Sequence, residues 1–361
     1  MHKILIVLTV VLILLSITGC GEFVGSDDDD VSIGKAQKME IYLSDENLYR
    51  LYNTVAVDTS VSCSVIFDKW KGDGRLKVRG YTSRMHAKKS FLLKIDGKKY
   101  VLERGHASGG IGTRIAMRTY QLAGLNACDT RTIGLFLNDE YLGCYNFITY
   151  YDEDVMGGEL YKSYFEDYNH MENNHPLRSL SEKKFPDDDN FANLENLLAA
   201  VTTLSDADWH QYVLDNVDIE KVAAYLAVHD FLLVKDTFRT NLYIAYNGKF
   251  YFLPWDNESC IKFNADTYEM GGDNQLTRRM TAVAEVKEAY NRKMRDLFIN
   301  GGIMPTLRTE VDKILDDASG AVKSDPNYKD NYNDFLDSKA RVQKFFSATG
   351  RVQTLSDPVL P

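Results

Sequence analysis

A short segment of this chain, from Asp236 to Glu258, concentrates side chains suited to metal and phosphate chemistry. Asp236 stands five residues before Asn241, and Asp256 and Glu258 close the segment. The same Asp-to-Asn spacing occurs in phosphoryl-transfer enzymes, where the Asp accepts a hydroxyl proton and the Asn holds a metal. Carboxylates separated by one residue add the oxygen ligands that hard cations prefer. The segment predicts Mg-nucleotide chemistry, although the spacing alone also suits an Asp236 that caps a helix or a loop.

The order of apolar and turn residues places these polar groups at one end of a β-hairpin. Residues 242–246 and 249–253 are rich in aromatic and β-branched types, and Asn247-Gly248 between them is a strong hairpin signal. In an antiparallel pair the start of the first strand lies beside the end of the second. We therefore expect Asn241 and Asp256 to be neighbours.

Several blocks of sequence resemble one known family. Asn241-Leu-Tyr-Ile-Ala-Tyr and Phe252-Leu-Pro-Trp-Asp resemble the signature of the spore-coat-protein-H (CotH) family of atypical protein kinases. Lys77-Val-Arg-Gly-Tyr-Thr-Ser-Arg, Lys88-Lys-Ser-Phe-Leu-Leu-Lys-Ile, the hairpin block from Gly134 to Tyr145 and Gly158-Glu-Leu-Tyr-Lys are similar to further family blocks. They occur in the expected order over roughly residues 40–350.

The resemblance implies an α+β fold of the two-lobed, atypical protein-kinase-like type, with a sheet-rich N-terminal lobe and a mainly helical C-terminal lobe. It implies phosphoryl transfer from ATP with Mg²⁺ to Ser or Thr of a protein. Asp236 would be the catalytic residue, and Asn241, Asp256 and Glu258 the metal ligands. Glu258 stands where the family usually has Asp, which keeps the charge and changes the reach.

Basic residues of the first half of the chain are candidates for nucleotide binding. Lysines and arginines are concentrated in residues 75–94, and such a cluster suits phosphate. Arg79, Ser83, Lys88 and Lys89 are the predicted nucleotide-binding residues. Because strand residues alternate between faces, only one of the two lysines should reach the nucleotide. The alternative is a solvated strand edge protected by lysine.

Composition is that of a folded, acidic protein. At 361 residues and 44% hydrophobic content the chain can bury a full core, and its length allows two lobes. The formal net charge of −10 argues against nucleic acid as a partner, because no basic excess exists to release counterions.

The N-terminus has the features of a bacterial lipoprotein signal. Lys3 precedes an apolar run over residues 4–15, and Ile17-Thr-Gly-Cys20 resembles a lipobox in which Cys20 becomes the acylated first residue. The protein would then be extracytoplasmic and membrane-anchored, with a protein substrate at the cell surface or envelope. Simple secretion with cleavage nearby is the alternative.

The remaining cysteines and the histidines show no metal-ligand spacing. Cys63, Cys128, Cys144 and Cys260 form no C-x-x-C pair, so buried free thiols are expected. The histidines lack the helical spacing of a zinc site. His229 and Asp230 are expected to be helix residues near the core, and Trp255 and Tyr243 to brace the carboxylates.

Residue patterns divide the chain into five regions. They are a signal peptide (1–20), a flexible acidic spacer (21–38), a sheet-rich lobe (39–155), a helical lobe with the catalytic hairpin as an island of strand (156–350) and a tail (351–361). Strands are expected at 59–67, 76–79, 90–95, 130–137 and 141–148, with a helix at 112–122. Later helices are expected at 190–203, 206–214, 218–234, 277–299, 304–318 and 328–347.

Two other function classes fit the same residues. One is a non-catalytic CotH-like adhesion or assembly protein of the cell surface, since a family fold can lose its activity. The other is a hydrolase that uses Asp236 and Asp256 as a carboxylate pair, as glycosidases do. Mg-dependent nucleotide binding separates the kinase from both.

The lipobox predicts the consequence of a single substitution. Cys20→Ser removes the acceptor thiol, so the variant should lose its lipid and its stable association with membranes. Metabolic labelling with a fatty acid, followed by membrane fractionation of parent and variant, measures both properties. Equal membrane partitioning of the two proteins would contradict the lipoprotein assignment.

Overall fold

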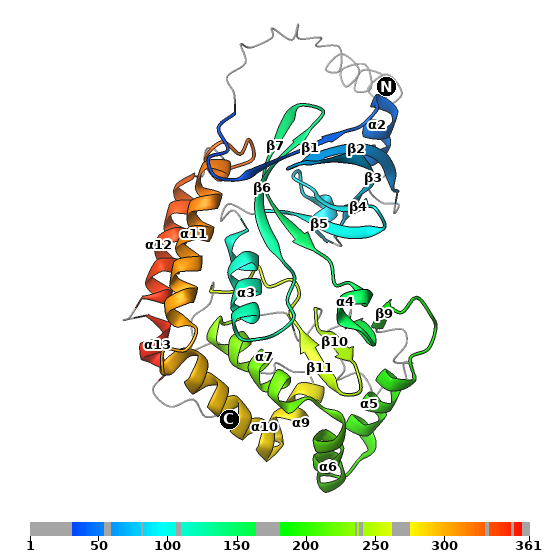
Figure 1. The fold of residues 1–361 in the computed structure, drawn as a ribbon, viewed down its shortest axis with the longest axis vertical. Helices are drawn as coiled ribbons and strands as arrows, with labels where there is room; N and C mark the ends of the chain where they lie inside the picture. The colour runs from blue at the N-terminus through cyan, green and yellow to red at the C-terminus, as the bar shows by residue number, and fades with distance from the viewer. Residues whose placement is uncertain are drawn as a thin grey trace, which may run out of the picture. The chain divides into compact units, whose positions relative to one another are not determined.

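The computed structural model describes residues 31–53, 59–80, 82–105, 110–163, 181–234, 237, 241–261, 275–328, 332–347 and 350–355. Residues 32–361 form one compact unit, shown in Figure 1. Among the helices in the described ranges, none is both long and apolar enough to cross a membrane.

Seven strands of the first half of the chain close into a barrel, where the sequence predicts only a sheet. The spatial order is β1-β2-β3-β4-β5-β7-β6, and parallel pairing of Met39 in β1 with Leu135 in β6 closes the ring. Alternation explains the interior: Val61, Cys63 and Val65 are buried, and the serines between them are exposed. The strands are β1 (Gln37–Tyr42), β2 (Val61–Phe67), β3 (Trp70–Arg79), β4 (Ser90–Ile95), β5 (Lys98–Arg104), β6 (Thr130–Leu137) and β7 (Glu140–Thr149).

The predicted hairpin is confirmed as β10 (Tyr243–Tyr246) and β11 (Phe250–Leu253), but it is not an island of strand. It belongs to a four-stranded sheet of order β11-β10-β8-β9, with β8 (Glu159–Ser163) and β9 (Ser181–Phe185). Gly248 in the turn has φ +75°, a conformation that glycine adopts without strain. Tyr243 pairs with Leu253 on one side and with Lys162 on the other.

Helices make up most of the remainder and largely follow the predicted ranges. They are α2 (Asp45–Asn53), α3 (Ile111–Leu122), α4 (Glu153–Met156), α5 (Ala192–Thr203), α6 (Asp206–Asn216), α7 (Ile219–Phe231), α9 (Gln275–Ala282), α10 (Ala284–Met294), α11 (Met304–Lys323), α12 (Tyr332–Phe346) and α13 (Arg351–Thr354). Short turns of helix cover Thr82–Met85 and Arg295–Ile299.

One predicted helix, 277–299, is wrong as a single element. The chain becomes extended at Val283, with φ −68° and ψ 129°, so α9 ends there and α10 begins. Val283 is itself buried. An extended residue breaks the helical hydrogen-bond ladder, and the apolar spacing on either side of it does not reveal the break.

The apolar core has two parts. One fills the barrel and contains Leu76, Phe91 and Leu93. The other lies among the helices, where the Phe231 and Phe298 rings stack with their centres 3.9 Å apart. Helix α3 packs on α7 and α11 and joins this second core, although it lies within residues 39–155. The lobe boundary at residue 155 therefore stays a prediction, as does the two-lobed arrangement.

Two of the sequence-based expectations about buried groups are confirmed. Cys63, Cys128, Cys144 and Cys260 are free thiols and all are buried. His229 lies in α7 with only 2% of its surface exposed, and burial lowers its pKa to about 3. His229 is therefore a neutral core residue.

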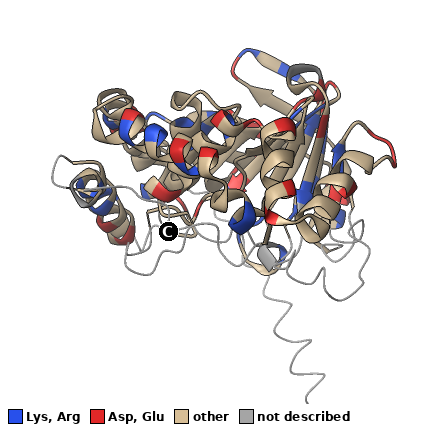
Figure 2. Ribbon diagram, turned by 90° about the horizontal axis from the view of Figure 1, so that it is seen from below, with Lys and Arg blue, Asp and Glu red and all other residues tan. Residues whose placement is uncertain are grey.

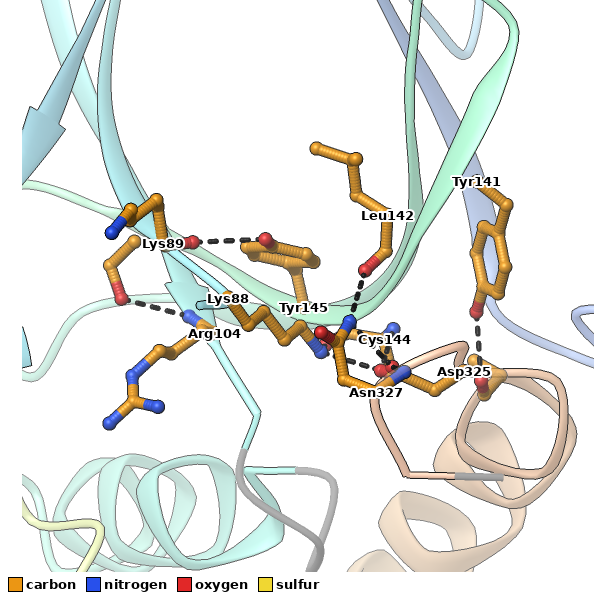
Figure 3. Close-up of polar contacts among 11 residues, drawn as sticks. Lys88, Lys89, Arg104, Tyr141, Leu142, Cys144, Tyr145, Asp325 and Asn327 are labelled. Carbon is orange, nitrogen blue, oxygen red and sulfur yellow. Dashed lines mark hydrogen bonds and ion pairs between the residues drawn. The ribbon is translucent and has the colours of Figure 1, made fainter. Parts of the chain in front are cut away.

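A buried ion pair ties the barrel to the end of α11 (Figure 3). The Lys88 ammonium, just before β4, lies 2.5 Å from Asp325 and also donates to the Cys144 carbonyl. Asp325 accepts a further hydrogen bond from the Cys144 amide at 2.7 Å. Gly143, with φ +117°, makes room for this contact, because a Cβ there would lie 2.2 Å from the Asp325 carboxylate.

Removal of one partner should strongly destabilise the fold. Lys88→Met leaves the Asp325 carboxylate buried without its counter-charge, which should cost about 3 to 5 kcal/mol of unfolding free energy. The matched control is the exposed pair Lys35–Asp316, whose Lys35→Met variant should leave the unfolding free energy almost unchanged, because water screens exposed charges. Urea denaturation measures both, and equal losses would show that the Lys88 pair is not structural.

Candidate functional site

The two ends of the hairpin bring Asn241 and Asp256 together, as the sequence predicts. The Asn241 side chain hydrogen-bonds to the Asp256 carboxylate. Asp256 has φ +56°, a left-handed conformation that few residues other than glycine, Asn and Asp adopt readily. The backbone therefore turns sharply directly after Trp255, and Asp256 keeps part of its surface exposed.

Charged side chains from three separate elements surround Asp256. The surrounding protein and the charge of Glu258 raise the pKa of Asp256, whereas Arg79 and Lys162 act in the opposite direction. Glu258 thus lies close enough to repel Asp256, and the two basic residues lie close enough to attract it. The site contains both the oxygens that bind cations and the cations that bind phosphate.

Lys162 is a functional candidate to which sequence analysis assigned no role. It lies on β8 directly opposite Tyr243, which places it beside the hairpin end that carries Asn241. Burial lowers the pKa of its ammonium to about 8, and the charge of Asp256 partly offsets this effect. Its block, Gly158-Glu-Leu-Tyr-Lys162, was the available signal, but only the β8–β10 pairing shows which site it joins.

Arg79 reaches the site from the last position of β3. Its guanidinium lies 5.6 Å from the centre of the Trp255 ring. Trp255 is buried and packs against Tyr150 and Tyr243, with ring centres 5.2 Å from each. Trp255 and Tyr243 are therefore bracing residues, as expected, and Trp255 also gives Arg79 a cation–π surface.

Glu103 on β5 adds a third carboxylate that sequence analysis missed. Burial, Glu258 and Asp256 raise its pKa to about 7. Asn146 on β7 donates to Glu103 at 2.8 Å and to the Gly110 carbonyl at 2.9 Å. No local motif marks Glu103, because it becomes part of the site only through the β5–β7 register, which pairs it with Asn146.

The start of α3 packs tightly against the loop that carries the carboxylates. A Cβ on Gly112 would lie 2.6 Å from the Glu258 carbonyl oxygen, so only glycine fits there. The Cys260 thiol donates to the Gly112 carbonyl at 3.2 Å. The backbone around Glu258 is therefore held against the first turn of α3.

Other predicted site residues lie elsewhere or outside the described ranges. The Lys88 ammonium forms an ion pair with Asp325, and the Lys89 ammonium donates to the Arg84 carbonyl at 2.7 Å. Ser83 belongs to the helical turn Thr82–Met85, and its side chain is outside the described part of the structure. Asp236 and Cys20 also lie outside the described residues.

The donor set fits a hard cation such as Mg²⁺. Asp256, Glu258 and Asn241 provide carboxylate and amide oxygens, the ligands that Mg²⁺ prefers. Burial and, after it, repulsion between carboxylates raise the pKa of Asp256 and Glu103, and a bound cation would relieve the repulsion. Among the residues that the structure describes, no three His, Cys, Asp or Glu side chains gather closely enough to form a metal cluster.

Comparison with known proteins identifies the class. Residues 76–352 match the family model described as CotH kinase protein, which covers more than half of the chain. The chain belongs to the CotH kinase family, an atypical kinase family.

One solved structure, the Helicobacter pylori proinflammatory kinase CtkA, is similar at 11% sequence identity and a TM-score of 0.35. The similarity covers 73% of this chain and 94% of that one. It is too low to assign any residue of the present site. A search of curated proteins found no match.

The raised pKa of Glu103 predicts a pH dependence of stability. In the unfolded chain Glu103 ionises at its ordinary pKa of 4.5, whereas in the folded protein it holds its proton to about pH 7. The folded state therefore binds more protons between these values, and its stability falls as pH rises through them. Glu103→Gln should remove this loss, making the variant more stable than the parent by on the order of 2 kcal/mol at pH 7.5 and by little at pH 4.5.

Urea denaturation of both proteins in EDTA at the two pH values measures this difference. The matched control is Glu288→Gln, an exposed position on α10. A gain for Glu103→Gln that does not change with pH would contradict the assignment of the raised pKa.

Proposed function

We propose that this protein transfers a phosphoryl group from Mg-ATP to Ser or Thr of an extracytoplasmic protein. Membership of the CotH kinase family supports a kinase-like function. The observation that carries the proposal further is the hydrogen-bonded pair Asn241–Asp256, flanked by Arg79 and Lys162. Oxygens of the type that binds metal ions and cations of the type that binds phosphate lie together there, from β3, β8 and the two ends of the β10–β11 hairpin.

The proposed roles follow from charge and position. Asp256 and Asn241 would hold Mg²⁺, with Glu258 as an additional ligand, and the ion would neutralise charge on the transferred group. Arg79 and Lys162 would bind the phosphates. Arg79 offers a planar fork of donors, whereas Lys162 is a compact charge that a bound phosphate would keep protonated despite its lowered pKa.

Lys88 and Lys89 receive different roles in this proposal from those that the sequence suggests. Lys88 would act structurally, because its ammonium already has an anionic partner. Lys89 would hold the loop before β4 through the Arg84 carbonyl, close to the helical turn that contains Ser83. The two lysines would thus support the backbone before β4 rather than contact phosphate directly.

Asp236 is proposed as the residue that orients or deprotonates the acceptor hydroxyl. Its support is the five-residue spacing to Asn241, together with the placement of Asn241 in the site. In phosphoryl transfer the protein contributes mainly positioning and electrostatic stabilisation, and a carboxylate near the acceptor supplies the proton acceptor.

The proposed location is the outer face of a bacterial membrane. The motif that ends at Cys20 supports lipid attachment, and the acidic spacer 21–38 would hold the folded unit away from the membrane surface. The substrate would then be a protein of the cell surface or envelope.

The central experiment separates metal binding from catalysis. Calorimetry of the full chain in neutral detergent should show ATP binding that requires Mg²⁺. Asp256→Asn removes a metal ligand and should weaken this binding together with transfer. Asp236→Asn should keep the binding and lower single-turnover transfer to a surface-protein extract by at least about 10²-fold.

The matched control is Asp296→Asn, which makes the same chemical change in the helical turn after α10 and should alter neither property. Equal Mg-ATP affinity in parent and Asp256→Asn would remove the metal role. A folded parent that binds no nucleotide would favour the non-catalytic surface protein, and nucleotide-independent turnover of a glycan would favour the hydrolase.

A further inference from the structure

Three basic side chains stand side by side on the outer face of the barrel. The strand registers pair Arg75 of β3 with Lys94 of β4, and Lys94 with Lys99 of β5. Paired residues project from the same face of a sheet, and all three residues are exposed. We call Arg75, Lys94 and Lys99 the basic row.

The basic row works against stability and does not protect a strand edge. Like charges directly opposite each other across a sheet are destabilising, by a few tenths of a kcal/mol up to about 1 kcal/mol. Lysines are often placed on free edges to prevent aggregation, but β3, β4 and β5 each have a paired strand on both sides in the closed barrel. Edge protection, the alternative that the sequence left open, therefore does not explain the row.

Few protein groups balance the charge of the row. Within the described ranges, no ion pair links these three residues to a carboxylate; Arg75 donates to Ser60, and the Lys99 ammonium lies 5.9 Å from the Tyr150 ring centre. Asp73, two residues before Arg75, accepts from Ser64 and ends the positive stretch. On the helices, by contrast, acidic and basic residues are interspersed (Figure 2).

The row leads directly to the candidate site by two routes. Along β3, every second residue points to the same face, so Arg75, Lys77 and Arg79 lie on one face. The Arg79 guanidinium lies over the Trp255 ring. Across the sheet, the Tyr150 amide donates to the Lys99 carbonyl, and the Tyr150 ring packs on Trp255. Arg75 and Arg79 are four positions apart on β3, which is about 13 Å at the usual rise per residue.

We propose that the basic row docks an acidic stretch of the protein substrate while the acceptor hydroxyl lies in the candidate site, near the metal ligand Asp256. The inference rests on the proposed phosphoryl transfer and adds a substrate class to it. An extended peptide advances by the same rise as β3, so the acidic residues stand at least about four positions from the acceptor Ser or Thr. Exposed charges of this kind contribute selectivity and association rate more than raw affinity, which suits a substrate that must leave.

The test uses two synthetic fluorescent peptides and the full chain in neutral detergent. Each peptide has a single Ser with an Ala spacer on both sides; one carries Glu from the fourth position outward, and the other carries Gln there. Anisotropy titration should show that the Glu peptide binds at least about tenfold more tightly. Lys94→Glu/Lys99→Glu should abolish that difference, and added salt should reduce it in the parent.

The matched control is Arg341→Glu/Lys344→Glu, which changes the net charge equally at two exposed positions of α12 and should keep the preference. All variants should bind Mg-ATP like the parent, because the row lies away from Asp256. The inference is overturned if parent and Lys94→Glu/Lys99→Glu bind the two peptides alike. It is also overturned if the peptides show no preference and the double variant instead loses binding to phosphatidylglycerol vesicles.

The same data separate the two proposals. A parent that prefers the Glu peptide but binds no Mg-ATP keeps the docking surface and rejects phosphoryl transfer. A parent that binds Mg-ATP without preferring the Glu peptide keeps phosphoryl transfer and rejects the docking surface.

Discussion

The pairing of β10 with two strands at once is the constraint on which the candidate site depends. Tyr243 lies opposite Leu253 on β11 and opposite Lys162 on β8. The first pairing sets Asn241 beside Asp256, and the second brings Lys162 to the same edge. Because side chains alternate along a strand, a slip of one residue in either register would turn these groups to the wrong face.

The barrel contributes the charged side chains Arg79 and Glu103 to the candidate site. Polar and ionic contacts hold it to the helical part of the chain. Lys88 of the barrel reaches Asp325 at the end of α11. Arg114 of α3 donates to Thr132 of β6 at 2.6 Å and pairs with Asp317 of α11 at 3.3 Å, so it links the barrel to that helix. Both pairs are at least partly withdrawn from water, so each depends on its partner to offset the loss of hydration. Arg79 and Glu103 thereby meet a hairpin that is more than 130 residues away in the sequence.

Opposite pKa shifts in the site have a common physical origin. Withdrawal from water raises the pKa of Glu103 and lowers that of Lys162, because burial disfavours whichever form is charged. Repulsion among Glu103, Asp256 and Glu258 adds to the first shift. A ligand that carries both a cation and phosphates would restore the charged form of both groups, which is the chemistry of a metal–nucleotide complex.

Local elements and the chemical types of the site residues could be predicted from the order of residues alone. Asn247-Gly248 between two aromatic runs specified the hairpin, and the hairpin specified that Asn241 and Asp256 meet, because turn geometry acts over a few residues. The family blocks, in their order along the chain, were sufficient to identify the class. Buried thiols and a core His229 followed from composition and spacing.

Which distant residues complete the site depends on long-range packing and could not be predicted from the sequence. Lys88 and Arg79 look equally suitable for phosphate binding in the sequence. In the structure Lys88 pairs with Asp325, whereas Arg79 lies over Trp255 in the candidate site. Closure of the barrel through β1 and β6, the break at Val283 and the entry of Glu103 into the site have no local signal either. Strand order and register depend on contacts between segments far apart in the chain, and the pattern of any one segment is compatible with several such arrangements.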